Sequence, residues 1–389
     1  MPQLIKDICL RNLLSFGPDT EPFALRPLNV LIGPNGSGKS NLIESISLLR
    51  SAPAEIASTV RDGGGIRDWL WKGEKHPTAR IEAVIEYPKG AVNLRHTLSF
   101  TEQAGRFELI DERIDDERKT DPNAVQPKFY FGYQNRRPYL NVNGQKRSLQ
   151  REDIDPEKSI LAQRKDPDQY PEITFLGREY ERIRLFREWS FGRYTPPRLP
   201  QKDTGSSRFL DDDCSNLGMV LNNLMGEPDV KAELLERVRD LYDGIDDIHV
   251  EIQSGHVQVV LHEGKMKIPA TRLSDGTLRY LCLLAILCHP ELPPLVCIEE
   301  PELGLHPDAL VAVTSLLKEA ANRSQLIVTT HAKIIVDALS ESPEDIVVCE
   351  KVGGQTRLNR LDGEELKVWL GKYSLGELWR SGDLGGNRW

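Results

Sequence analysis

The stretch Gly33-Pro34-Asn35-Gly36-Ser37-Gly38-Lys39-Ser40 decides the fold of this chain of 389 residues. It matches the pattern G-x-x-x-x-G-K-[ST], in which glycines let backbone N–H groups turn inward around a phosphate. The apolar run LNVLI at residues 28–32 predicts a buried strand before it, and apolar residues at helical spacing predict a helix over 39–49. Strand, loop and helix in this order are the context that a phosphate-binding loop requires.

Two side chains of this loop carry specific chemistry. Lys39 is expected to reach the β- and γ-phosphates of a nucleoside triphosphate, and the Ser40 hydroxyl to ligate Mg²⁺. The chain has no N-K-x-D guanine-reading motif, so we expect ATP and Mg²⁺ as cofactors. The residues predicted to bind nucleotide here are Gly33, Pro34, Asn35, Gly36, Ser37, Gly38, Lys39, Ser40 and Asn41.

A second apolar run ends in two carboxylates. Residues 295–298 (LVCI) are followed by Glu299 and Glu300. Such a strand delivers both acids to the sheet edge at which α/β folds bind ligands. Glu299 is expected to hold Mg²⁺, directly or through water, and Glu300 to polarise the attacking water as general base.

Composition narrows the class of protein. Fifty Lys and Arg against 59 Asp and Glu give a net charge of −9, which argues against indiscriminate nucleic-acid coating but not against a local basic patch. The longest apolar run, residues 280–288, is too short for a membrane helix, and the N-terminus has no secretory pattern, so we expect a cytoplasmic protein without membrane contact. The six cysteines form no C-x-x-C pair, which predicts buried thiols.

The pentapeptide Leu273-Ser274-Asp275-Gly276-Thr277 resembles the ABC-type signature L-S-G-G-Q, with Asp275 and Thr277 as departures. In that superfamily the signature binds the γ-phosphate held by the opposite subunit. The resemblance therefore implies this role for Ser274, Asp275 and Gly276. A serine that simply caps the following helix is the plainer alternative for Ser274.

Other motifs point to a branch of that superfamily. Thr329-Thr330-His331 resembles the switch histidine, which contacts γ-phosphate, and residues 300–307 occupy the place of the D-loop at the dimer interface. The sequences at 10–16, 40–46 and 299–307 are similar to the RecF, SMC and OLD (overcoming lysogenization defect) branch, whose members work on DNA. Long coiled-coil arms are absent, and residues 332–389 are too few for a Toprim nuclease domain. The chain therefore resembles a compact, stand-alone ABC-type AAA ATPase head of the kind associated with defence against phage.

The resemblance implies an α/β fold, the ABC-type P-loop ATPase head, with a β-rich first lobe, a helical second lobe and an insertion. We place the first lobe at 1–110, the insertion and second lobe at 111–270, and the signature helix, carboxylate strand, switch histidine and tail at 271–389. Polar composition over 111–168 predicts an irregular surface insertion. Further predicted elements are hairpins over 80–100 and 248–262, helices over 179–189, 230–242, 275–288 and 307–322, and a strand over 325–329.

Four residues are weaker candidates for the nucleotide site. Gln163 is our choice for the Q-loop glutamine, which would contact Mg²⁺ and nucleotide where the insertion returns to the core; an ordinary surface glutamine is the alternative. Arg11 and Asn12 are candidates for contact with the base or phosphates. Arg279 either contacts phosphate across the dimer or pairs with a carboxylate.

Three stretches have two interpretations each. Residues 178–198 hold six arginines interleaved with aromatic residues, which is typical of a nucleic-acid grip or of a helix with solvated arginines. A second basic cluster comprises Arg136, Arg137, Lys146 and Arg147. The tail from Trp369 to Trp389 holds three of the six tryptophans, so it either packs on its own head or docks a partner protein.

These observations predict a dimeric switch that binds and hydrolyses ATP. Two copies would close as a homodimer around two ATP molecules and act with a separate effector protein in DNA metabolism or anti-phage defence. DNA stays open as a partner. The alternatives are an ATP-gated scaffold or sensor that restrains an effector with little turnover and, less favoured, a transporter nucleotide-binding subunit.

Overall fold

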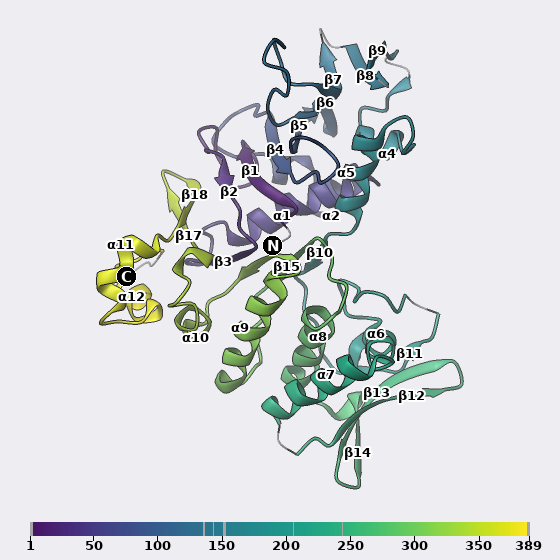
Figure 1. Cartoon of the computed structure of the whole chain (residues 1–389), viewed down its shortest axis with the longest axis vertical. Helices are drawn as coiled ribbons and strands as arrows, with labels where there is room; N and C mark the ends of the chain where they lie inside the picture. Colours follow the sequence, from purple (N-terminus) through teal and green to yellow (C-terminus); the bar gives the residue numbers. More distant parts are fainter. Residues whose placement is uncertain are drawn as a thin grey trace.

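A six-stranded sheet forms the centre of the computed structural model, which describes residues 3–134, 137–142, 144–150, 153–204, 206–242 and 244–386 (Figure 1). Five neighbouring strands are parallel and the last is antiparallel. Their order is β10 (Arg184–Phe186), β15 (Leu295–Glu299), β16 (Gln325–Thr329), β3 (Leu28–Ile32), β17 (Ile346–Val352) and β18 (Gln355–Arg360).

The central strands are apolar throughout because both faces of the sheet are covered. Leu28, Val30 and Ile32 of β3 join one hydrophobic core, which includes α8 (Asp275–Leu287) and α9 (Pro307–Ala321). Leu31 points to the opposite face and joins the core that contains α1 (Lys39–Ser51). The sheet thus separates the cores of the two lobes.

The first lobe is built on an eight-stranded antiparallel sheet with helices packed on it. The predicted hairpin over 80–100 is confirmed as β4 and β5. The strands, in sheet order, are β2 (Phe23–Ala24), β1 (Ile5–Arg11), β4 (Ala79–Ile85), β5 (Leu94–Gln103), β6 (Arg106–Asp116), β7 (Phe129–Gln134), β8 (Arg137–Val142) and β9 (Gln145–Ser148). The helices are α2 (Ile56–Asp62), α3 (Ile66–Trp69), α4 (Ile160–Gln163) and α5 (Pro171–Glu181).

The prediction of an irregular insertion is wrong for much of residues 111–148, because β6 to β9 continue this sheet; residues 117–128, between β6 and β7, are irregular as predicted. The charged residues of β6 lie on both faces of the strand and find partners there: the buried Glu112 carboxylate lies 3.1 Å from His96 Nε2, and Arg113 pairs with Asp115. Arg113 Nε lies 2.8 Å from Asp115 Oδ2, and the Asp115 side chain is almost completely buried. Charge density alone therefore does not indicate a loop here.

The second lobe combines helices with a small sheet. α6 (Leu217–Leu224) packs on this small sheet, and α7 (Pro228–Leu241) and α8 join the same hydrophobic core, so the second lobe is helical as expected but not exclusively so. The predicted hairpin over 248–262 is confirmed. The sheet comprises β11 (Gln201–Lys202), β12 (Asp247–Gln253), β13 (His256–Glu263) and β14 (Met266–Pro269).

The prediction of a helix over 179–189 is wrong. α5 ends at Glu181, and the chain then forms β10, which pairs in parallel with β15. Leu185 and Phe186 of β10 are buried, so tertiary pairing overrides the helical spacing of the charged residues.

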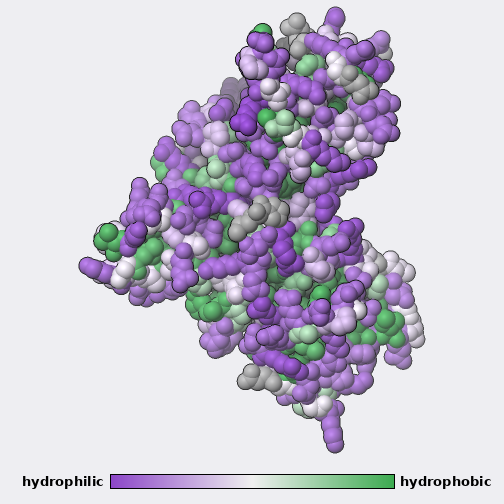
Figure 2. Space-filling model, in the orientation of Figure 1, coloured by the Kyte–Doolittle hydropathy of each residue, from purple (hydrophilic) through white to green (hydrophobic). Residues whose placement is uncertain are grey.

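The C-terminal tail divides into a packed part and an exposed part. Leu375 and Leu378 of α12 (Leu375–Ser381) are buried beside α10 (Lys333–Asp337). α11 (Gly363–Leu370) instead leaves Val368 77% and Trp369 51% exposed. Figure 2 shows hydrophobic side chains gathered at the surface over α11 and α12. Trp389 lies outside the described residues.

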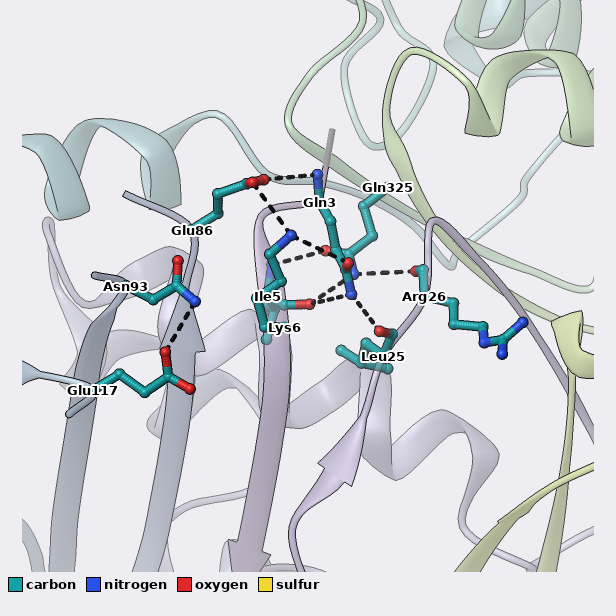
Figure 3. A network of polar contacts seen from close by, with 9 residues as sticks. All are labelled: Gln3, Ile5, Lys6, Leu25, Arg26, Glu86, Asn93, Glu117 and Gln325. Carbon is teal, nitrogen blue, oxygen red and sulfur yellow. Dashed lines mark hydrogen bonds and ion pairs between the residues drawn. The ribbon is translucent and has the colours of Figure 1, made fainter. Parts of the chain in front are cut away.

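A buried glutamine joins the two large sheets (Figure 3). Gln325 of β16 accepts from the Ile5 N–H at 2.9 Å and donates to the Ile5 carbonyl at 2.8 Å. It also donates to the Arg26 carbonyl at 3.2 Å. Since Gln325 is fully buried, these bonds satisfy its amide where β1 of the first lobe meets the central sheet.

All six cysteines are buried free thiols, as predicted. In the described part of the chain, no helix is long and apolar enough to cross a bilayer.

Candidate nucleotide site

The phosphate loop follows β3 and opens α1, with Gly38 as the helix N-cap. Gly38 has φ +103°, and a Cβ there would lie 2.1 Å from Thr356 Oγ1 and 2.7 Å from Ser15 Oγ. Thr356 donates to the Ser37 carbonyl at 2.8 Å. Glycine is thus required because β18 and the turn after β1 hold the loop tightly from outside.

The Lys39 ammonium lies inside this loop. Its Nζ donates to the Gly33 carbonyl at 2.8 Å and to the Pro34 carbonyl at 3.2 Å. Burial lowers the pKa of Lys39, and the nearby Glu300 and Glu299 carboxylates oppose that change. A charged lysine in the mouth of an N–H-lined loop at a helix N-terminus is suited to bind phosphate.

Ser40 and Glu299 meet at the adjoining edge of the sheet. Ser40 Oγ donates to Glu299 Oε2 at 3.4 Å, although the residues are far apart in the chain. Burial raises the pKa of the Glu299 carboxyl, and the Arg187 guanidinium counteracts the shift. A hydroxyl and a carboxylate are oxygen donors of the kind that Mg²⁺ prefers, so this pair fits the ion.

Glu300 and His331 form the next contact along this edge. His331 Nε2 lies 3.6 Å from Glu300 Oε1. Glu300 has φ +45°, and its backbone is held by N–H donation to the Thr329 carbonyl at 3.0 Å and by Arg279, which donates to its carbonyl at 3.0 Å. Such backbone strain in a non-glycine residue concentrates at functional sites. Burial, followed by the positive charge of Lys39, lowers the pKa of His331, which favours a neutral imidazole.

Glu302 is a site residue to which the sequence analysis gave no role of its own. Its Oε1 accepts from Thr330 Oγ1 at 2.8 Å and from the His331 N–H at 2.6 Å. Glu302 therefore fixes the backbone that carries the switch histidine. Its position within the motif around residues 299–307 was the available signal.

The signature loop begins α8 in the second lobe. Ser274 caps the helix by accepting from the Thr277 N–H at 3.0 Å, and its hydroxyl lies 2.8 Å from that of Thr277. Asp275 forms an ion pair with Arg198, whose side chain is 9% exposed. A Cβ on Gly276 would lie 2.3 Å from the Gly304 carbonyl, so the D-loop packs directly on this loop. Both departures from the signature thus have local partners.

Arg11, Asn12 and Gln163 make polar contacts away from the phosphate loop, whereas Asn41, which was predicted with that loop, lies beside it. Arg11 is exposed and donates to the Thr20 carbonyl at 3.2 Å, and Asn12 donates to the Thr78 carbonyl at 3.4 Å. Asn41 donates to Ser15 Oγ at 2.6 Å, beside the phosphate loop. Gln163 accepts from the Asp155 N–H at 3.0 Å in the first lobe. The nucleotide roles of these residues stay predictions.

The chain returns to the central sheet through β10, and Arg187 follows that strand directly. The return that we expected at Gln163 therefore falls at Arg187. Arg187 Nε donates to Glu299 Oε1 at 3.1 Å, and its NH1 forms an ion pair with Glu44. The sequence analysis could not predict a role for Arg187, because the sequence of β10 does not show that this strand pairs with β15.

The two basic stretches have different surroundings. In the first, Tyr180, Phe186 and Phe191 are buried, which favours their role in the core over base stacking, while Tyr194 is 80% exposed. In the second, Lys146 of β9 lies 4.0 Å from the Tyr139 ring centroid. Arg136 of that cluster lies outside the described residues.

The carboxyl ends of three adjacent parallel strands bring the site together. β3 leads to the phosphate loop, β16 to His331, and β15 to Glu299 and Glu300. With a capped signature helix in a second lobe, this arrangement defines an ABC-type P-loop ATPase head. The family described as "AAA domain, putative AbiEii toxin, Type IV TA system" matches residues 28–337, and the chain belongs to this AAA family.

Solved structures support the same fold. The chain is similar to an SMC head bound to the C-terminal winged-helix domain of ScpA, at 14% identity and a TM-score of 0.59, over 93% of this chain and 99% of that one. It is equally similar to the SMC head with an extended coiled coil bound to the C-terminal domain of ScpA from Pyrococcus furiosus, at 14% identity and TM-score 0.59, over 96% and 99% of the two chains. No curated protein matches the chain. The predicted ABC-type fold is thus confirmed.

Proposed function

We propose that the chain is a switch that binds and hydrolyses ATP and closes as a homodimer around two nucleotides. The observation that carries the proposal is the convergence at one sheet edge of Lys39 and Ser40 with the Glu299–Glu300 pair and His331. The contacts are 3.4 Å from Ser40 to Glu299 and 3.6 Å from His331 to Glu300. Binding groups, an oxygen donor set and a base thus lie side by side.

The residues divide the work of hydrolysis among them. Lys39 and the N-terminus of α1 bind the phosphates, and Ser40 and Glu299 hold Mg²⁺, which supplies charge neutralisation when it is bound. Glu300 orients and deprotonates the attacking water. His331 donates a hydrogen bond toward the γ-phosphate while Glu302 holds its backbone.

A second copy is required because the signature loop belongs to the other lobe. Among the described residues, the polar contacts of the Ser274 side chain are with Thr277 of its own helix. The first turn of α8 offers N–H groups and a hydroxyl to an anion from outside. A γ-phosphate presented by a second copy supplies that anion.

Effector and cellular role are also part of the proposal. The two similar SMC heads are bound to domains of ScpA, which is the precedent for a separate protein partner. The family description names a toxin–antitoxin system, which fits a role in anti-phage defence. We place this activity in the cytoplasm, with DNA as an open partner.

Steady-state ATP hydrolysis by the full chain tests the proposal. We expect Mg²⁺-dependent turnover that Lys39→Ala abolishes, that Glu300→Gln strongly reduces and that Lys89→Ala, at an exposed position, leaves unchanged. Tight ATP binding with no turnover in the unmodified chain would contradict hydrolysis and favour the ATP-gated scaffold.

A further inference from the structure

The side chain of Arg187 lies where the metal-binding oxygens converge. Its Nε is 3.1 Å from Glu299 Oε1, and its NH1 pairs with Glu44 Oε2. Ser40 and Glu44 are four residues apart on α1, so they lie on the same face of that helix. The hydroxyl and the two carboxylates thus form one set of oxygens around a guanidinium.

The Glu44 and Glu299 carboxylates of this oxygen set are partly shielded from solvent, and both pair with Arg187. The side chains of Arg187, Glu44 and Glu299 are 30%, 19% and 17% exposed. Within the described ranges, the ion pairs of both glutamates are with Arg187. Two neighbouring carboxylates that are partly shielded from water are stabilised by a nearby positive charge, and the guanidinium supplies it.

We propose that Arg187 is the resident cation of the metal site: it neutralises Glu299 and Glu44 in the nucleotide-free protein, and a divalent cation arriving with nucleotide displaces it from Glu299. The inference rests on the proposed function. A guanidinium and a divalent ion compete for one carboxylate, because both positive charges cannot approach it without repelling each other. Glu44 retains Arg187 after the exchange.

The displacement has a route to the signature loop. Two residues after Arg187, Trp189 Nε1 donates to the Glu299 carbonyl at 2.8 Å, and the Trp189 ring stacks on Phe191 at 6.0 Å between centroids. Arg198 donates to the Phe191 carbonyl at 2.9 Å and pairs with Asp275. A continuous chain of contacts thus joins the metal site to the loop that would receive the second copy.

Mn²⁺ binding to the full chain, measured by electron paramagnetic resonance without nucleotide, tests the inference. Arg187→Gln removes the competing charge, so we expect Mn²⁺ affinity to rise about tenfold or more, whereas Arg187→Lys stays close to the unmodified chain. With ATP present, the difference between Arg187→Gln and the unmodified chain shrinks, since Arg187 is already displaced.

Arg50→Gln is the matched control. Arg50 lies on α1, lines the same 1050 Å³ groove as Arg187 and pairs with Asp212 rather than with Glu299. We expect its Mn²⁺ affinity to change less than about threefold, because the lost charge is not in the oxygen set. An equal gain in Arg50→Gln and Arg187→Gln would overturn the inference, as would unchanged affinity in Arg187→Gln.

Two further measurements distinguish failure of this inference from failure of the proposed function. Fluorescent ATP binding to the unmodified chain in EDTA reports the phosphate loop alone, and its absence would refute the proposed function instead. If Arg187→Gln unfolds by circular dichroism, Glu44→Gln replaces it. That variant frees Arg187 to pair more closely with Glu299, so we expect weaker Mn²⁺ binding, and a gain would overturn the inference.

Discussion

The phosphate loop and the signature loop both present a helix N-terminus, yet the molecule holds them by different means. The phosphate loop closes around its own Lys39 through the carbonyls of Gly33 and Pro34. The signature loop is held by a distant side chain, Arg198, which binds the Leu273 carbonyl and Asp275. The phosphate loop thus has an internal lysine in addition to its contact with Thr356 of β18, whereas the signature loop depends on the distant Arg198.

Removing the Lys39 side chain should have the largest effect, the loss of phosphate binding by the phosphate loop. In Lys39→Ala we expect ATP affinity to fall on the order of a hundredfold, because a charge-assisted contact to phosphate is lost from a buried position. Isothermal calorimetry measures the affinity, with Lys89→Ala as control. Undiminished affinity would refute the assignment of this loop.

Glu300→Gln should keep ATP bound between the phosphate loop of one copy and the signature loop of the other. We expect hydrolysis to fall about a hundredfold or more while ATP still binds, because only the base is removed. The variant should therefore persist as a closed dimer on size-exclusion chromatography with ATP and Mg²⁺. An elution position that ATP does not change would contradict the gated dimer. If the chain is already dimeric without ATP, Ser274→Arg replaces this test and should prevent the ATP-dependent closure.

Arg198→Ala should disable the signature loop and spare the phosphate loop. Its buried guanidinium donates to the Phe191 and Leu273 carbonyls, which Arg198→Ala leaves unpaired, so we expect the free energy of unfolding to fall by about 3 kcal/mol. ATP affinity should stay unchanged, while dimerisation and hydrolysis fall about tenfold. Asp275→Gly, at a side chain that is 69% exposed, should cost much less. Equal losses in both variants would show that the ion pair, rather than the carbonyl contacts, holds the loop.

Much of the site follows from local sequence. The runs at β3, β15 and β16 are apolar throughout because each strand is buried, and the polar motif after each run lies at a common sheet edge. The strand, loop and helix around Lys39, and the meeting of Glu300 with His331, could thus be predicted from motif and strand order. The fold class followed from the same elements.

The rest depends on pairings that no single segment encodes. Arg187 becomes part of the site only because the three residues of β10 pair with β15. Arg198 reaches Asp275 through a connection whose course is set by tertiary contacts. Strand β6 was missed because the partners of its charged residues lie on other segments of the chain, such as His96 of β5 for Glu112, so that its sequence alone resembles a solvated loop.

The smallest expected effect is on the pH dependence of stability, and it comes from His331, which lies beside Lys39 of the phosphate loop. Burial and Lys39 lower the pKa of His331 below its ordinary value of 6.5, so below pH 6.5 the unfolded chain binds more protons at this residue than the folded chain does. This contribution to the free energy of unfolding therefore falls as pH decreases from 6.5 toward the folded pKa. In His331→Gln the contribution is absent, so its melting temperature should fall less between pH 7.5 and pH 5.5 than that of the unmodified chain, with His256→Gln at an exposed histidine of the second lobe as control.

Bound ATP places negative charge beside His331, which favours the imidazolium and should reduce the difference. Identical pH dependence in His331→Gln and the unmodified chain, without nucleotide, would contradict a neutral switch histidine held beside Lys39.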